Sequence, residues 1–228
     1  QLPAGTYLIR ETQTVKGYAL DTNVRKITLN WGEDKIIEWE NYPLASIEIE
    51  KLDKESGKPI SGVKFRVLDS GKKQLGEYTT DSQGKISLED MFIEGTYYIQ
   101  EQELEGYLPN TGLQTVKTKW GKTTDITIEN QPIMGRVKIE KVSADNNPIN
   151  GILKGQGLEN AEFTIYDSEG NEVEVLKTDK KGFAVSKKLR YGEYTMKETK
   201  TPTYYLNEEE AISFNIEKDG ETVNIRRE

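Results

Sequence analysis

The sequence contains no cysteine and no histidine. The first absence excludes disulfides and thiolate nucleophiles, and the second excludes Ser-His triads and most zinc or haem sites. Any chemistry must therefore come from carboxylates, side-chain amides, lysines and hydroxyl groups. We expect neither a cofactor nor a metal ion.

Long apolar runs and an excess of positive charge are also missing. No run approaches the roughly 18 to 20 apolar residues of a membrane span, so none is expected in this fragment. Lysine and arginine number 31 against 39 aspartate and glutamate, a net charge of -8. Such a balance disfavours nucleic acid as a partner, because phosphates require a basic surface. With 34% hydrophobic and 31% charged residues, the chain has only enough apolar material for small cores.

What the sequence does contain is a repeat. The segment Tyr7–Glu11 (YLIRE) returns as Tyr97–Glu101 (YYIQE) and as Tyr194–Glu198 (YTMKE), at intervals of about 90 residues. This interval is typical of tandem small domains that each bury a core. We expect the C-terminal part of an incomplete repeat at 1–43, a complete repeat at 44–133, and a repeat lacking its terminal asparagine at 134–228.

The fold class follows from short alternating runs rich in Val, Ile, Thr, Tyr and Phe, separated every 8 to 12 residues by turn signals. This pattern predicts an all-β protein of tandem small Greek-key sandwiches, Ig-like or prealbumin-like, arranged as a rod. No window has a helical period, although residues 88–92 could form a single helical turn. Residues 147–158 are predicted to widen the loop after the first strand of the last repeat. The strands expected in the complete repeat are 46–53, 62–69, 72–79, 84–88, 95–101, 113–120 and 123–130.

Three polar residues fall at inward-facing positions of these strands. Alternation along a strand places Lys51, Glu101 and Asn130 on the apolar faces of the first, fifth and last strands. A buried ammonium or carboxylate without a partner costs several kcal/mol, so these groups must compensate one another.

Two interpretations of this trio remain open. The first is a buried salt bridge between lysine and glutamate with a hydrogen bond from the asparagine. The second is chemical, because desolvation favours a neutral, nucleophilic amine and a protonated carboxylic acid. The amine could then attack the asparagine side-chain carbonyl while the acid stabilises the intermediate and transfers protons. The product would be a Lys-Asn isopeptide bond.

The motifs around the trio resemble a known family. Ile-Glu-Lys occurs at 49–51 and 139–141, and Ile-Glu-Asn at 128–130 has the counterpart Trp-Glu-Asn at 39–41. The segment 7–18 (YLIRETQTVKGY) resembles the pilin E-box pattern YxLxETxAPxGY. The second copy, at 97–107, differs from this pattern at the threonine and is one residue shorter. The third copy, at 194–205, keeps Glu-Thr but lacks the glycine. The chain thus resembles tandem Cna-B-type (SpaA-like) repeats of Gram-positive surface adhesins and pilins along essentially its whole length.

The resemblance implies roles for individual residues. It implies that Glu101 promotes an isopeptide bond between Lys51 and Asn130 without any enzyme. Glu11 and Glu198 are its equivalents in the outer repeats, where Asn41 and Lys141 lack a bonding partner in this chain. Phe65 and Phe163 are implied to form part of the apolar wall around the bond.

The implied function is structural. The chain is expected to be a stalk or shaft segment of an extracellular, cell-wall-anchored adhesin or pilin, with its anchor outside this fragment. Neighbouring repeats of the same polypeptide are the expected partners, with host extracellular matrix or pilus subunits as further candidates. The alternative is an adhesive module that binds a host matrix protein or glycan directly. An enzyme is not expected, because the chemistry is a single self-reaction without turnover.

Other signals carry less weight. Leu108–Gly112 (LPNTG) spells a sortase motif, but strand residues follow it instead of an apolar span, so it is not interpreted as an anchor. Oxygen-rich turns at Asp53 and at 145–147 lack the spacing of an EF-hand calcium loop. Trp31 and Trp120 occupy equivalent hairpin positions and could form a ligand platform, or more simply pack at a joint.

Overall fold

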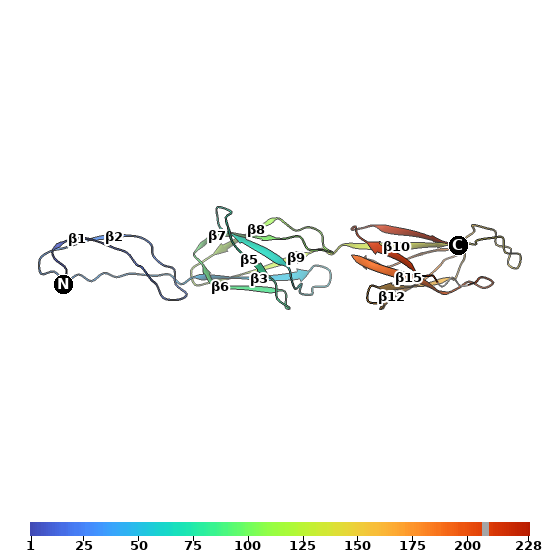
Figure 1. Cartoon of the computed structure of the whole chain (residues 1–228), viewed down its shortest axis with the longest axis horizontal. Helices are drawn as coiled ribbons and strands as arrows, with labels where there is room; N and C mark the ends of the chain where they lie inside the picture. The colour runs from blue at the N-terminus through green and yellow to red at the C-terminus, as the bar shows by residue number, and fades with distance from the viewer. Residues whose placement is uncertain (207–209) are drawn as a thin grey trace. The chain divides into compact units, whose positions relative to one another are not determined.

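The computed structural model describes residues 1–206 and 210–228 (Figure 1). Throughout these residues, all regular secondary structure is β-strand, as predicted. The chain divides into two compact units, one of residues 1–103 and 110–129, the other of residues 104–109 and 130–228. The division falls at the end of the last strand of the middle repeat.

Residues 1–43 contain one hairpin. Strands β1 (Gly5–Ile9) and β2 (Arg25–Leu29) pair antiparallel, and alternate residues of each strand are half-buried. Every residue from 1 to 43 nevertheless keeps appreciable exposure. This segment therefore presents one side of a core and not a closed one.

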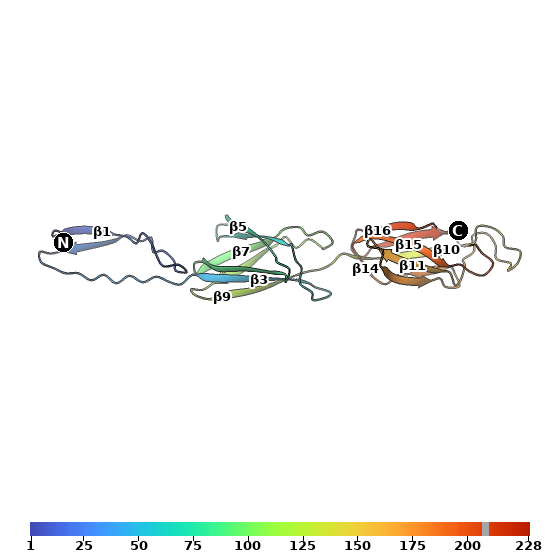
Figure 2. The ribbon, with the colours of Figure 1, turned by 60° about the horizontal axis from the view of Figure 1, so that its bottom comes forward.

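The middle repeat is built from two sheets, which Figure 2 shows from a second direction. One sheet has the strand order β6-β3-β9, and the other has the order β5-β4-β7-β8. The strands are β3 (Ala45–Asp53), β4 (Lys64–Leu68), β5 (Gln74–Thr79), β6 (Lys85–Phe92), β7 (Gly95–Glu101), β8 (Leu113–Thr118) and β9 (Thr123–Asn130).

The core of this repeat lies on the alternating faces of the strands. Ile47 and Ile49 of β3 are buried, as are Phe65 of β4 and Ile99 of β7. Each such side chain stabilises the fold by about 1.5–3 kcal/mol relative to its exposed state. The same alternation places the polar residues Lys51 and Glu101 inside, because they continue the buried faces of β3 and β7.

The third repeat follows the same plan. Strand β10 pairs antiparallel with the short strands β13 and β14 and parallel with β17, while the second sheet has the order β12-β11-β15-β16. The strands are β10 (Met134–Lys141), β11 (Glu162–Asp167), β12 (Glu172–Lys177), β13 (Phe183–Val185), β14 (Leu189–Arg190), β15 (Gly192–Lys200), β16 (Ile212–Ile216) and β17 (Thr222–Arg227).

No helical turn forms at 88–92, because β6 continues as a strand to Phe92. Leu88 pairs with Ile47 and Phe92 pairs with Ala45. Between these two pairs lie three residues of β6 but only one residue of β3. Asp90 within this bulge has a φ of +49°. The four-residue spacing of two buried side chains looks helical in the sequence but arises here from the bulge.

The predicted wide loop of the third repeat is confirmed. Between β10 and β11 the chain forms only an isolated bridge, from Val142 to Gly157, along residues 142–161. Asn147 organises the loop, since its side-chain oxygen accepts a hydrogen bond from Ile149 N and its main chain pairs with Ile152.

Candidate functional site

The middle repeat buries a lysine and a glutamate against each other. Lys51 lies on the buried face of β3 and Glu101 ends that of β7, and their side chains are 0% and 2% exposed. Lys51 Nζ lies 3.7 Å from Glu101 Oε2. It also donates a hydrogen bond of 3.2 Å to the carbonyl oxygen of Ile128 on β9.

The third predicted residue, Asn130, is the last residue of β9. It is 2% exposed and lies two positions after Ile128, on the same face of a strand that borders β3. The ammonium of Lys51 is thus held at the main chain of β9, two residues from the asparagine amide. Adjacent strands bring a potential nucleophile and a potential electrophile to one buried region.

The protonation of Lys51 is perturbed by this burial. Desolvation lowers the pKa of the Lys51 amine, and the nearby Glu101 carboxylate opposes this effect only in part. A lowered pKa increases the fraction of neutral amine, which is the nucleophilic form.

Two phenylalanines adjoin the buried glutamates. Phe65 stands opposite Glu101 in the pairing of β4 with β7, and Phe163 stands opposite Glu198 in the pairing of β11 with β15. Both rings are almost fully buried. The strand pairing thus places an apolar residue across from each glutamate in the neighbouring strand.

Two glycines that hold the lysines in place are not apparent from the sequence. Lys51 N donates to Gly84 O, and Lys141 N donates to Gly182 O, each at 2.8 Å. Both glycines have positive φ, and a Cβ would lie 2.7 Å from Lys51 O at the first and 2.3 Å from Lys141 O at the second. Neither position can accommodate a side chain without moving the lysine strand. The available signal was the turn Asp-x-x-Gly, which occurs in both repeats.

The third repeat contains the lysine and the glutamate of the trio. Lys141 Nζ lies 3.1 Å from Glu198 Oε2, with side chains 4% and 3% exposed, and donates to the carbonyl oxygen of Glu228 at 2.9 Å. Asn224 of β17 is exposed on the outer face of the strand, and its side chain donates a hydrogen bond to Thr222 O.

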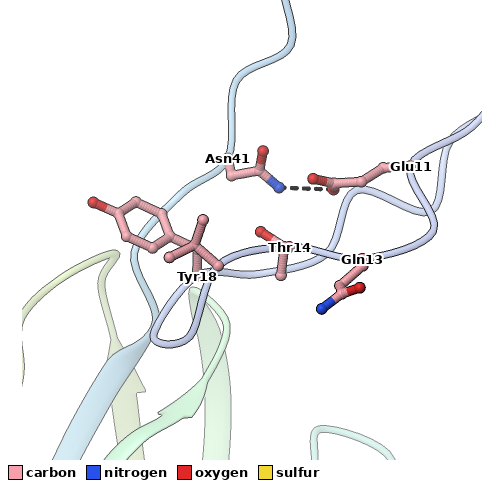
Figure 3. Close-up of a pocket in the computed structure, with 6 residues that line it drawn as sticks. Glu11, Gln13, Thr14, Tyr18 and Asn41 are labelled. Atoms are coloured by element: carbon pink, nitrogen blue, oxygen red, sulfur yellow. Dashed lines mark hydrogen bonds between the residues drawn. The ribbon is translucent and has the colours of Figure 1, made fainter.

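The first repeat contains the glutamate and the asparagine. Glu11 Oε2 accepts a hydrogen bond of 2.7 Å from Asn41 Nδ2 (Figure 3) and one of 2.8 Å from Asp21 N. Asn41 Nδ2 also donates to Ala19 O. Both site side chains are only half-buried. The structure thus brings together those members of the trio that each terminal repeat possesses.

The turn that follows each glutamate distinguishes the third repeat. Gly17 and Gly106 have φ values of +83° and +79°, and Tyr204 occupies the same position with a φ of +74°. The Gly17 carbonyl accepts a hydrogen bond from Leu44 N, whereas the Tyr204 carbonyl accepts one from the Asn147 side chain. The wide loop therefore supports a tyrosine in a conformation that favours glycine.

We expect Tyr204→Gly to stabilise the third repeat by about 0.5–1 kcal/mol. Relief of the left-handed strain, about 1 kcal/mol or more, exceeds the larger chain entropy that glycine loses on folding. Hydrogen exchange in β15 and β16 measures this change. The control Tyr204→Ala removes the ring but keeps the strained φ, so a glycine variant no more stable than the alanine variant would contradict the argument.

The remaining sequence signals stay outside the site. Leu108–Gly112 forms an exposed loop segment that leads into β8. Trp120 stacks on Tyr42 with ring centroids 5.2 Å apart, which fits packing at a joint, while Trp31 is 92% exposed. Among the described residues there is no cluster of acidic side chains arranged to hold a metal ion, and no helix long and apolar enough to span a membrane.

Comparison with known proteins identifies similar domains. The family model "SpaA: Prealbumin-like fold domain" matches residues 45–132 and 135–228. Serine-aspartate repeat-containing protein F of Staphylococcus epidermidis is 31% identical over 168 residues, covering 68% of this chain and 10% of that protein. Serine-aspartate repeat-containing protein D of Staphylococcus aureus strain Newman is 28% identical over 189 residues, covering 77% of this chain and 14% of that protein. The chain therefore spans about a tenth of the length of these relatives.

Solved structures give the same picture of the fold. The TIE protein of Bacillus anthracis is 31% identical with a TM-score of 0.69, covering all of this chain and 42% of that one. A C-terminal fragment of the pilus adhesin SpaC from Lactobacillus rhamnosus GG has a TM-score of 0.52 at 17% identity, covering 81% and 96%. At that identity the second likeness concerns the fold alone.

Proposed function

The chain belongs to the family of SpaA prealbumin-like fold domains, and we propose that it is a structural shaft segment of a Gram-positive surface adhesin or pilin. Its repeats, at 44–133 and 134–228, act as load-bearing units of an extracellular protein. An autocatalytic bond between Lys51 and Asn130 closes the middle repeat. The observation that carries this proposal is the buried Lys51–Glu101 pair, held against the strand that ends in Asn130.

The bond forms within the folded repeat. The neutral amine of Lys51 attacks Cγ of Asn130, and Glu101 donates a hydrogen bond to the developing oxyanion. Glu101 then transfers a proton from the lysine nitrogen to the departing amide nitrogen. The Cγ–Nδ2 bond breaks, the Cγ–Nζ bond forms and one ammonia molecule leaves. No cofactor or metal ion takes part, and the reaction occurs once per molecule.

The position of the bond suits a protein under tension. Lys51 lies in the first strand of the repeat and Asn130 ends the last. Force that enters at residue 44 and leaves at residue 131 passes through the bond instead of unravelling the residues between its ends. Such a staple replaces the disulfide that a chain without cysteine cannot form.

Intact-mass measurement of the purified chain tests the proposal. We expect a mass lower than the sequence mass by one ammonia molecule, because one repeat holds all three reactive residues. Tandem mass spectrometry of a digest should recover Lys51 and Asn130 in one branched peptide.

Two variants serve as controls for the mass measurement. Lys51→Ala should restore the unmodified mass, and Lys141→Ala in the third repeat should leave the loss of one ammonia unchanged. A full sequence mass in a well-folded parent protein would refute the bond.

A further inference from the structure

The outer face of the β6-β3-β9 sheet in the middle repeat, which we call the acidic face, has an excess of negative charge. Side chains alternate along a strand, so the residues between the buried ones of β3, β6 and β9 point away from the core (Figure 2). Their charged members are one lysine and five carboxylates, namely Lys85, Glu48, Glu50, Glu89, Asp125 and Glu129. Glu48 and Asp125 are exposed to solvent.

The corresponding face of the third repeat, on β10, β13 and β17, has an excess of positive charge, and we call it the basic face. Its outward charged residues are one carboxylate and three cations, namely Glu140, Arg136, Lys138 and Arg226. Arg226 Nε lies 3.8 Å from Glu140 Oε2, so Arg136 and Lys138 provide the excess charge. Lys138 follows Glu48 by 90 residues and occupies its position in the strand that ends in Ile-Glu-Lys. The same position of one fold thus carries opposite charges in the two repeats.

The cations of the basic face are held in place before any partner arrives. Lys138 Nζ lies 4.2 Å from the centre of the Phe183 ring on the neighbouring strand β13. The Arg136 guanidinium donates a hydrogen bond of 2.7 Å to Ser186 O. A hollow of about 170 Å³ is lined by Lys138, Phe183 and Arg226 among others. Because these side chains are already ordered, an incoming carboxylate is bound at a lower cost in side-chain entropy.

The charge of the basic face runs against that of the whole chain. The chain has a net charge of -8, so an excess of cations on one sheet face does not follow from its composition. The acidic face offers carboxylates on a sheet of the same architecture. Complementary charges steer two surfaces together and suppress wrong partners. The chain therefore carries both halves of a complementary contact.

We propose that the acidic face of the middle repeat binds the basic face of the third repeat in a second copy of this chain. Glu48 and Asp125 of one molecule then face Arg136 and Lys138 of the other. The contact is heterologous, so every added copy leaves one acidic and one basic face free for further copies. It is weak and sensitive to salt, because its charges are exposed to solvent. In a surface shaft, such contacts join neighbouring molecules without a covalent bond.

Sedimentation velocity of the complete chain over a concentration series tests this inference. We expect association at about 0.1 M salt and its loss at about 1 M salt, where the Debye length falls from about 10 Å to about 3 Å. The basic-face variant Arg136→Glu/Lys138→Glu and the acidic-face variant Glu48→Lys/Asp125→Lys should each raise the dissociation constant about tenfold or more, because like charges now meet. An equimolar mixture of the two variants should associate again, since each then meets a face of opposite charge.

A matched control separates the two faces from net charge. Lys177→Glu/Lys197→Glu changes the net charge as the basic-face variant does, but it alters exposed residues of β12 and β15 in the other sheet. It should associate as the parent does. Glutamate is tolerated at the position of Lys138, because Glu48 occupies it in the middle repeat, and circular dichroism checks that every variant is folded.

Three outcomes would overturn the inference. The first is a parent chain that sediments as a monomer at its highest soluble concentration, and the second is a mixture of the two variants that fails to associate. The third is a monomeric chain that binds heparin through Arg136 and Lys138, which would make the basic face a polyanion site. The Lys51–Asn130 bond is read separately from intact mass, so failure of the association leaves the proposed function untouched.

Discussion

Replacement of Glu101 by glutamine is expected to leave the middle repeat folded but without its isopeptide bond. Glutamine has the shape of glutamate and can hydrogen-bond to the neutral Lys51 amine, but it cannot transfer protons. Loss of a general acid–base group slows a reaction by roughly 10²- to 10⁴-fold. Intact mass followed over days after purification should therefore show the full sequence mass decaying slowly, if at all.

The matched control is Glu103→Gln, two residues further along the chain. Glu103 is exposed, so its replacement changes the net charge equally without touching the buried site. It should form the bond as the parent does. A bond that forms at the parental rate in Glu101→Gln would mean that burial of Lys51 and Asn130 alone is sufficient.

Asn130→Ala is expected to destabilise the middle repeat by about 4–5 kcal/mol. By analogy with a disulfide, a bond that closes a loop of roughly 80 residues lowers the entropy of the unfolded chain by about this amount. Denaturant-dependent hydrogen exchange in β3 and β7 measures the loss for this repeat alone. Asn224→Ala removes an exposed amide from the third repeat and should change the stability of the middle repeat very little.

The destabilisation by Asn130→Ala should depend on pH, because the variant keeps a titratable Lys51. Burial lowers the pKa of Lys51 in the folded variant below its usual value of 10.5. At pH values between the pKa of Lys51 in the folded state and its pKa in the unfolded state, the unfolded state therefore binds more protons. The free energy of unfolding of the variant rises with pH through this range, so the difference in stability between the variant and the parent, which we call the gap, narrows. A gap that widens between pH 7 and pH 10 would contradict the assigned burial effect.

Alternation was sufficient to predict most of the fold and the burial of the site. Ile47, Ile49 and Lys51 share a face because a strand repeats every two residues, and the structure buries all three. The bulge at Asp90 could not be predicted, because its cause is pairing with Ala45 across the sheet. Periodicity within one segment contains no information on such a partner.

The supporting residues of the site were harder to predict for a similar reason. In the sequence, Gly84 looks like an ordinary turn residue. Its importance is that a Cβ at this position would lie only 2.7 Å from Lys51 O. The half-exposed state of Glu11 and Asn41 likewise depends on which strands lie around them. Close approach and exposure are properties of the assembled sheets.

The exposed loop at Leu108–Gly112 lies between the two ends of the proposed bond. With Lys51 joined to Asn130, residues 51–130 form a covalent ring, and a protease that cuts this loop opens the ring without separating the chain. Both fragments would still migrate as one species under denaturing conditions. A surface protein in a protease-rich environment would, with this bond, tolerate a single cut in this loop and remain continuous.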